Sequence, residues 1–196
     1  MISVKNLDLS YGEKHVLRGC SLEIPAGGHA ALMGPSGQGK TTLLKALLGL
    51  TKAQRGTAEV RGKAAVVFQE PRLLPERTAA ENVNAVLSDT AETMPQALEW
   101  LTKVGLADSA NLYPQELSGG MQQRVAIARA LAFGGDVLLL DEPLKGLDAA
   151  LRAEMLTLLQ KESAGKTLLL ITHDEADART LCGTVYKLES GLMRIM

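Results

Sequence analysis

Short apolar segments separated by polar turns run along the whole chain, and the spacing within them predicts an α/β fold. Near the N-terminus apolar side chains recur at every second position, as in Ile2 and Val4 or Leu7 and Leu9, which is typical of strands buried on one face. Other segments are apolar at every position, which indicates strands buried on both faces of a parallel sheet. These segments are 137–140 and 168–171, the latter within a predicted strand 167–171, and residues 30–33 form a further apolar strand. Further strands are predicted at 20–24, 57–60, 64–68 and, as a closing hairpin, 184–196.

The pattern changes after Pro71. Residues 78–87 and 95–104 carry few strand formers and are predicted to be helices. We therefore expect a small helical subdomain at 74–115, inserted into a nucleotide-binding α/β core formed by residues 1–73 and 116–196. The 196 residues are expected to form one domain.

Composition narrows the classes of protein that the chain can belong to. Hydrophobic residues make up 46% and charged residues 22%, with a net charge of −1, which argues against general binding to nucleic acid or anionic lipid. Cys20 and Cys182 are too few for a disulfide framework, so we expect a reducing compartment. No secretory signal is evident, and every apolar run is far shorter than the ~20 residues of a membrane-spanning helix. A membrane process would need another chain to span the bilayer.

A glycine-rich stretch after the predicted strand 30–33 fits the phosphate-binding pattern G-x-x-x-x-G-K-[ST] and opens a helical segment. Its glycines allow backbone conformations that turn successive N–H groups toward a phosphate chain, and the helix adds its positive N-terminal end. Lys40 is expected to reach the β- and γ-phosphates, and the Thr41 hydroxyl is expected to hold Mg²⁺. The predicted nucleotide-binding residues of the loop are Gly34, Pro35, Ser36, Gly37, Gln38, Gly39, Lys40, Thr41 and Thr42.

Two adjacent carboxylates follow the buried strand 137–140. Asp141 suits Mg²⁺, directly or through water, and Glu142 suits polarising an attacking water, with helix capping as the structural alternative. Gln69 and His173 also come directly after predicted strands, although a single histidine is usually structural. Ligands of open parallel sheets bind at the C-terminal ends of the strands. We therefore expect these side chains to gather with the phosphate loop at one edge of the sheet.

A second candidate for phosphate binding is Ser118-Gly119-Gly120. Ser118 is a good N-cap, and the two glycines would occupy the first helical turn, where each costs up to roughly 1 kcal/mol against alanine. That cost is reasonable where bare N–H groups must meet an anion, and an ordinary capped helix is the alternative. Tyr11 either stacks on a nucleotide base or packs at the end of a strand.

Together these residues resemble the ATP-binding subunit of an ABC transporter over nearly the whole chain. The motifs are Tyr11, the adenine-stacking aromatic; 34–42, Walker A; Gln69, the Q-loop; 117–121, the family signature; 137–142, Walker B; 145–148, the D-loop; and His173, the switch histidine. The resemblance implies a P-loop NTPase core with a parallel sheet, an N-terminal antiparallel β subdomain and the inserted helical subdomain. It also implies ATP and Mg²⁺ as ligands, with Thr41, Gln69 and Asp141 at the metal.

The resemblance also implies partners. A second cassette, expected to be an identical chain, would pack head to tail so that Ser118, Gly119 and Gly120 close over the partner's ATP. Glu142 would orient water there, and the catalytic site would be completed by Lys40, Gln69 and His173. Separate integral membrane permease subunits would dock on the helical subdomain and residues 69–75. This chain would then be a peripheral protein on the cytoplasmic face of the inner or plasma membrane, with a solute-binding protein as an indirect partner and no nucleic acid.

The run 69–75 and Met121 resemble importers of the nitrate, sulfonate, taurine and bicarbonate group. Residues 144–148, Leu-Lys-Gly-Leu-Asp, depart from the more usual Ser-Ala-Leu-Asp ending, which is expected to alter communication between sites while keeping Asp148. The chain also lacks the C-terminal regulatory extension of some importers, so inhibition by substrate through this subunit is not expected.

Two other ABC proteins are alternatives to an importer subunit. Soluble ABC ATPases that act on nucleic acid or ribosomes resemble paired cassettes or carry long inserted helices, whereas this chain is one compact cassette. An exporter cassette differs in its membrane partner. Among other P-loop proteins, a GTPase would show an Asn-Lys-x-Asp run, which is absent, and a kinase would not need residues 117–121.

Overall fold

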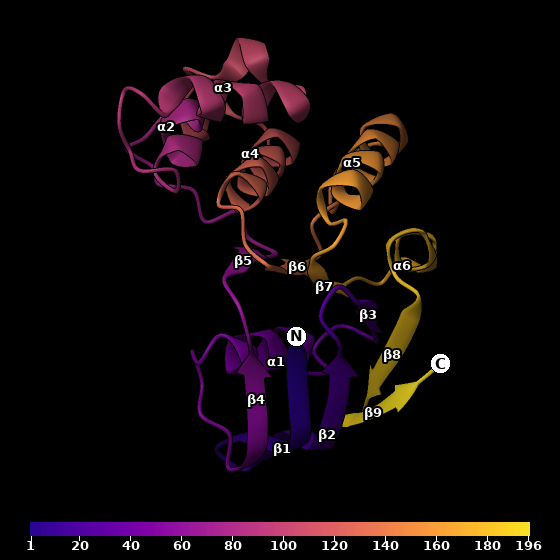
Figure 1. The fold of residues 1–196 in the computed structure, drawn as a ribbon. Coiled ribbons are helices and arrows are strands. Elements are labelled where there is room, and N and C mark those ends of the chain that lie inside the picture. The colour runs from indigo at the N-terminus through magenta and orange to yellow at the C-terminus, as the bar shows by residue number, and fades with distance from the viewer. The chain divides into compact units, whose positions relative to one another are not determined.

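The computed structural model describes residues 1–196, which form two compact units (Figure 1). The first unit contains residues 1–64, 136–142 and 163–196, and the second contains 65–135 and 143–162. None of the helices has the length and apolarity that a membrane crossing would require.

An antiparallel sheet begins the first unit. Its strands are β1 (Ile2–Tyr11), β2 (Lys14–Ile24) and β4 (Arg55–Val60), in the order β2-β1-β4. The alternating side chains Ile2, Val4, Leu7 and Leu9 are all buried, so the period of two predicted the buried face correctly. This sheet is the expected N-terminal antiparallel β subdomain.

A parallel sheet forms the rest of the first unit. Neighbouring strands follow the order β6 (Val137–Asp141), β7 (Thr167–Ile171), β3 (His29–Met33) and β8 (Thr184–Glu189), and β9 (Leu192–Ile195) pairs antiparallel to β8. Every residue of β6 and β7 is buried, as the uninterrupted apolar runs predicted. Two helices belong to this unit, α1 (Lys40–Leu47) and α6 (Glu175–Leu181). The parallel sheet confirms the predicted fold class.

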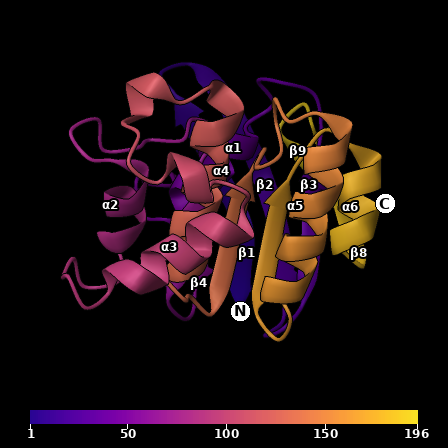
Figure 2. The same cartoon turned by 90° about the horizontal axis from the view of Figure 1, so that it is seen from above.

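The second unit is mainly helical. Its helices are α2 (Ala79–Asn84), α3 (Met94–Lys103), α4 (Gly119–Ala132) and α5 (Ala149–Glu162), with short 3₁₀ turns at Ala107–Ser109 and Pro114–Glu116. The strand β5 (Ala64–Val67) lies where the chain passes from the first unit into the second. α4 packs against both α2 and α3, and Figure 2 shows the same neighbours from above. The predicted subdomain 74–115 lies within this unit, and its boundaries stay a prediction.

Side chains that accept hydrogen bonds from free N–H groups set the start of several helices. Thr78 and Glu81 form a reciprocal capping box before α2, and Ser118 Oγ accepts from the Met121 N–H at the start of α4. Asp174 Oδ1 accepts from the Ala176 and Asp177 N–H groups at 2.8 and 3.1 Å. α6 was not predicted from the sequence, although an Asp at this position is a recognisable start signal.

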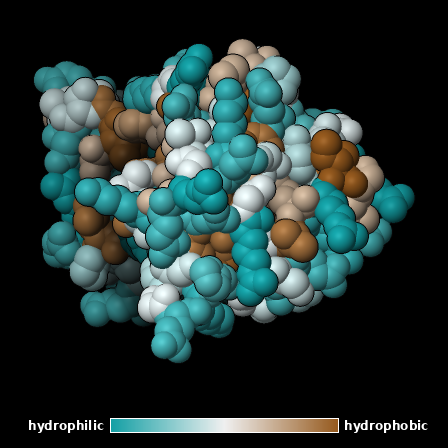
Figure 3. All heavy atoms as spheres, turned by 90° about the horizontal axis from the view of Figure 1, so that it is seen from below, coloured by the Kyte–Doolittle hydropathy of each residue, from teal (hydrophilic) through white to brown (hydrophobic).

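Large hydrophobic residues are mostly inside the protein. Those exposed include Leu192, Ile195 and Met196 near the C-terminus. Seen from below, hydrophobic surface occurs as small patches among hydrophilic residues (Figure 3).

Candidate nucleotide-binding and catalytic site

The loop between β3 and α1 has a backbone that only glycine adopts easily. Gly34, Gly37 and Gly39 have φ of +147°, +78° and +104°. A Cβ on Gly34 would overlap the backbone carbonyl oxygen of Leu188 in β8, and one on Gly39 would lie 2.7 Å from Val16 Cγ1. All three glycines are therefore required by their backbone conformation, and Gly34 and Gly39 also by close packing. The N–H groups of the loop lie beside the positive end of α1.

Lys40 is the first residue of α1 and is buried. Its ammonium donates to the carbonyl oxygens of Gly34 and Pro35 at 2.6 and 3.0 Å. The cation therefore lies across the mouth of the loop, held only by uncharged acceptors. A phosphate oxygen would offer it a stronger, charge-assisted hydrogen bond.

Thr41 and Asp141 bring two oxygen ligands together from α1 and the end of β6. Thr41 Oγ1 donates to Asp141 Oδ2 at 3.0 Å, and Asp141 is only 2% exposed. Burial raises the pKa of Asp141 from its ordinary value; the Thr41 hydrogen bond lowers it, the charge of Glu142 raises it, and that of Lys40 lowers it. A buried carboxylate beside a hydroxyl has the hard oxygen donors that Mg²⁺ prefers, so these residues fit the predicted cation.

Glu142 and His173 form the second pair of the site. His173 Nδ1 lies 2.8 and 3.0 Å from the two carboxylate oxygens of Glu142. The side chain of Glu142 is 13% exposed and that of His173 is 69% exposed. Glu142 has a φ of +49°, in the left-handed region that costs a non-glycine residue about 1 kcal/mol or more, and its N–H donates to the Ile171 carbonyl at 2.9 Å. The backbone is thus held in an unfavourable conformation that directs the carboxylate to His173.

One further loop contact and an exposed aromatic ring complete this part of the site. Gln38 Oε1 accepts from the Ser190 N–H at 2.7 Å, so the closing hairpin contacts the phosphate loop. Tyr11 lies at the end of β1 and is 51% exposed. An exposed ring leaves a π-face available for a base, which agrees with the stacking role that the resemblance implies.

The first unit thus brings together the phosphate loop, Thr41, Asp141, Glu142 and His173 at the C-terminal ends of β3, β6 and β7. This arrangement is the one predicted for a parallel sheet. Gln69 belongs to the second unit.

In the second unit, the start of α4 opens on a hollow of about 840 Å³. Ser118, Gly119, Gly120, Gln69 and Lys145 are among the residues that line it. A Cβ added to Gly119 would meet nothing within 4 Å, whereas one on Gly120 would lie 3.3 Å from Leu147. The first turn of α4 is therefore bare on the Gly119 side, as an anion-binding helix start requires.

Two polar side chains behind this helix start are buried. Arg124 Nη1 donates to the Val104 and Gly105 carbonyls at 2.9 and 3.1 Å, which ties α4 to the end of α3. Its Nε and the Gln123 Nε2 are buried without a hydrogen-bond partner. Burial lowers the pKa of Arg124 from its ordinary value.

The phosphate loop and its carboxylates lie in a stretch of the chain that matches a known protein family. Residues 17–145 match the family model described as ABC transporter. The chain belongs to the ABC transporter family. The match includes the phosphate loop, Gln69, the start of α4 and the Asp141-Glu142 pair.

Curated relatives cover nearly the whole chain. The aliphatic sulfonates import ATP-binding protein SsuB of Pseudomonas putida is 43% identical over 97% of this chain and 73% of the relative. The SsuB of Corynebacterium glutamicum is 44% identical over 96% of this chain and 80% of the relative. These relatives confirm the predicted ATPase subunit of an importer and its resemblance to the sulfonate group; the soluble and exporter alternatives are not favoured.

Solved cassettes have the same fold. The dimeric structure of MJ0796, a bacterial ABC transporter cassette, matches with a TM-score of 0.92 at 34% identity, covering 100% of this chain and 98% of that chain. A dimeric post-hydrolysis state of MJ0796, bound to ADP and Pi, matches with a TM-score of 0.91 at 33% identity over the same shares. The chain is therefore a nucleotide-binding, ATP-hydrolysing ABC cassette.

Proposed function

We propose that this chain powers the import of small organic anions of the aliphatic sulfonate class, working as a head-to-tail dimer of identical chains on the cytoplasmic face of a membrane. One observation carries the ATPase part of the proposal: the phosphate loop, the Thr41–Asp141 pair and the Glu142–His173 pair share one edge of one sheet. The relatives named as sulfonate importers support the solute class.

The residues of the first unit divide the chemistry among them. Lys40 would exchange the Gly34 and Pro35 carbonyls for phosphate oxygens, and the N–H groups of the loop would hold the rest of the phosphate chain. Thr41 and Asp141 would hold Mg²⁺, with Gln69 as a further ligand, and the cation would neutralise phosphate charge when bound. Tyr11 would stack on the adenine.

Glu142 would orient the attacking water or accept a proton from it. Glu142 suits this role because it lies beside the predicted metal ligand Asp141 and is not itself a predicted metal ligand. Its bond to His173 restricts the carboxylate to one direction. His173 is mostly exposed and can therefore also face a neighbouring molecule.

The second unit would act on the partner's nucleotide. Ser118, Gly119 and Gly120 present a bare helix start, and Lys145 adds a positive charge in the same hollow. A dimer in which each α4 closes over the partner's phosphate loop uses both phosphate-binding elements of the chain. Permease subunits would dock at residues 69–75 and the helices of 74–115, with a solute-binding protein delivering the solute to the permease.

Phosphate release from Mg-ATP by the purified chain tests the ATPase proposal. We expect the rate per chain to rise with protein concentration, because the active form is a dimer, and Glu142→Gln to give a stable dimer with ATP by light scattering. No phosphate release, or a Glu142→Gln chain that stays monomeric in excess Mg-ATP, would overturn it.

The solute class is tested on the complex purified in mild detergent from its native membranes. Recovery of a polytopic membrane protein, with an ATPase rate stimulated by an alkanesulfonate and not by a carboxylate of equal chain length, supports the proposal. A complex that contains only soluble partners, or that responds equally to both anions, contradicts it.

A further inference from the structure

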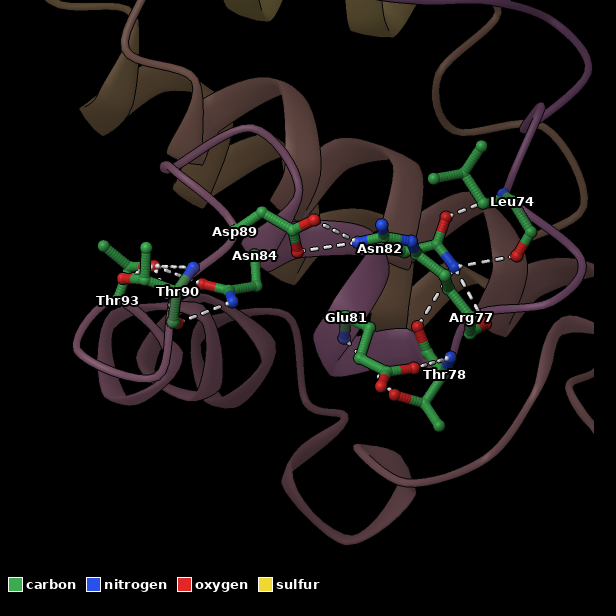
Figure 4. A network of polar contacts seen from close by, with 9 residues as sticks. All are labelled: Leu74, Arg77, Thr78, Glu81, Asn82, Asn84, Asp89, Thr90 and Thr93. Carbon is green, nitrogen blue, oxygen red and sulfur yellow. Dashed lines mark hydrogen bonds and ion pairs between the residues drawn. The ribbon is translucent and has the colours of Figure 1, made fainter.

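The segment that follows Gln69 is held by a buried amide. Asn82 on α2 is 0% exposed. Its Oδ1 accepts from the Leu74 N–H at 2.8 Å, and its Nδ2 donates to the carbonyls of Leu74, Arg77 and Thr78 at 3.1, 3.0 and 3.0 Å. Figure 4 shows the amide enclosed by these backbone groups. Asn82 therefore adds hydrogen bonds to residues 74–77, which belong to no helix or strand, and to the N-cap residue Thr78.

A guanidinium holds the same segment from the other side. Arg129 on α4 donates through Nη1 to the Arg72 carbonyl at 3.0 Å and to Asn82 Oδ1 at 3.4 Å, and through Nη2 to the Pro71 carbonyl at 2.9 Å. These acceptors are all uncharged oxygens. Burial lowers the pKa of Arg129 from its ordinary value, as expected for a cation withdrawn from water without a carboxylate.

The chain bends at Pro71 and Arg72, whose carbonyls Arg129 holds, and this bend has an unfavourable backbone conformation. Arg72 has a φ of +49°, in the left-handed region. Its guanidinium lies 4.2 Å from the ring centroid of Phe68, the residue before Gln69. Arg129 therefore holds the carbonyls of both residues of the bend, and Phe68 contacts the Arg72 side chain. Pro71 and Arg72 lie two and three residues after Gln69.

The helix that supplies Arg129, α4, is also the one that Ser118 caps at its N-terminus. A single side chain thus joins the segment carrying Gln69 to the helix whose first turn carries Gly119 and Gly120. Because α4 is a continuous helix of 14 residues, a displacement of the bend would be passed to its first turn.

We propose that Arg129 and Asn82 are positioning residues for ATP hydrolysis, which fix the bend after Gln69 to α4 so that Gln69 and the Ser118 helix start keep one geometry. The inference rests on the proposed function, in which Gln69 completes the catalytic site and Ser118 faces the partner's nucleotide. The hydrogen bonds of both positioning residues go to residues 71–78 and to each other rather than to the phosphate loop, so their loss should affect turnover and spare nucleotide binding at that loop.

The test compares Arg129→Met, Arg129→Lys and the isosteric Asn82→Asp with the wild type in the full chain. Arg129→Met keeps the length of the side chain and removes its donors, whereas Lys retains one ammonium for the two carbonyls. Asn82→Asp keeps the acceptor for the Leu74 N–H and removes both amide donors. The matched control is Arg77→Met, which lies in the same segment and loses only the ion pair with Asp89 at 2.6 Å.

Three quantities are measured: amide hydrogen exchange over residues 70–77, the ATP dissociation constant by calorimetry, and kcat per folded molecule. In Arg129→Met and Asn82→Asp we expect exchange about tenfold faster and kcat about ten- to a hundredfold lower, with the ATP dissociation constant within about twofold of wild type. Arg129→Lys should recover part of kcat. Arg77→Met should stay within about twofold of wild type in all three.

A kcat that stays normal while exchange rises would overturn the inference, as would unchanged exchange. So would a loss of ATP binding in proportion to kcat, which indicates a structural role alone. If Arg129→Met does not fold, Arg129→Lys and Asn82→Asp decide between the same outcomes. Absence of hydrolysis in the wild type would instead refute the proposed function, and exchange over 70–77 would still report whether the two residues hold the bend.

Discussion

Replacing single glycines of the phosphate loop by alanine should produce losses of stability in an order that follows from the geometry. Gly37 has a φ of +78° and open space where a Cβ would lie, so alanine meets only the backbone penalty of about 1 kcal/mol. At Gly39 a Cβ would also lie 2.7 Å from the Val16 side chain. Because that side chain can move partly aside, we expect the alanine to lower the stability by about 2 kcal/mol. At Gly34 a Cβ would overlap the Leu188 backbone carbonyl, which cannot move unless the loop separates from β8. We therefore expect this alanine to lower the stability by about 3 kcal/mol or more.

Thermal unfolding of the nucleotide-free proteins measures this order. For a chain of this size 1 kcal/mol lowers Tm by about 2–4 °C. Gly37→Ala should therefore melt about 2–4 °C below wild type, and Gly34→Ala at least about 6 °C below it. Gly37→Ala is the matched control, because it changes the same residue type in the same loop without a clash. Equal melting temperatures for the two variants, or a Gly34→Ala protein as stable as wild type, would refute the reasoning.

Other predictions concern binding, turnover and pH. Lys40→Ala should weaken ATP binding at least about tenfold by calorimetry, since the loop loses its one charged hydrogen-bond donor to phosphate; unchanged affinity would show that Lys40 does not reach the phosphates. Glu142→Gln should lower kcat by about 10²–10⁴ while sparing ATP affinity, and a small effect would remove it from the role of base. Tyr11→Ala should weaken ATP binding by about 1–3 kcal/mol if the ring stacks on the base, whereas equal affinity would return Tyr11 to a structural role. Because burial raises the pKa of Asp141 in the folded state, the nucleotide-free protein loses stability as pH rises from the unfolded-state pKa through the higher folded-state pKa. Asp141→Asn should therefore melt higher than wild type at pH 7 without nucleotide, and the difference should vanish below that window; a lower Tm at pH 7 would contradict the cause given for the shift.

Local sequence patterns were sufficient for most of the fold. The period of two located β1 and residues 20–24 of β2, and the apolar runs located β6 and β7, because burial on one or both faces determines which positions are apolar. Helix α6 was missed because its seven residues are too few for a periodic pattern, and only Asp174 signals its start.

The site was predictable where its residues follow strands. The phosphate loop, Asp141, Glu142 and His173 could be assigned to one edge because parallel strands end together. The hydrogen bond between Glu142 and His173 could not be predicted, because 31 residues separate them and the sequence does not say which side chains lie side by side at that edge.

Long-range contacts of polar side chains with the backbone also could not be predicted from the sequence. Arg129 meets Pro71 and Arg72 across 58 and 57 residues, and Gln38 meets Ser190 across 152. An arginine on a helix dominated by apolar residues was the one available signal for Arg129, and it does not identify the acceptors.

Mixing two inactive variants tests the head-to-tail dimer most directly. Lys40→Ala damages the phosphate loop of its own chain, and Ser118→Arg damages the helix start that would face the partner's nucleotide in the proposed dimer. In a mixed head-to-tail dimer one composite site contains both lesions, and the other contains an intact phosphate loop and an intact helix start. We predict that each variant alone releases no phosphate from Mg-ATP and that the mixture regains activity. A mixture that stays inactive, although light scattering shows mixed dimers, or a Ser118→Arg chain that is fully active alone, would contradict the account.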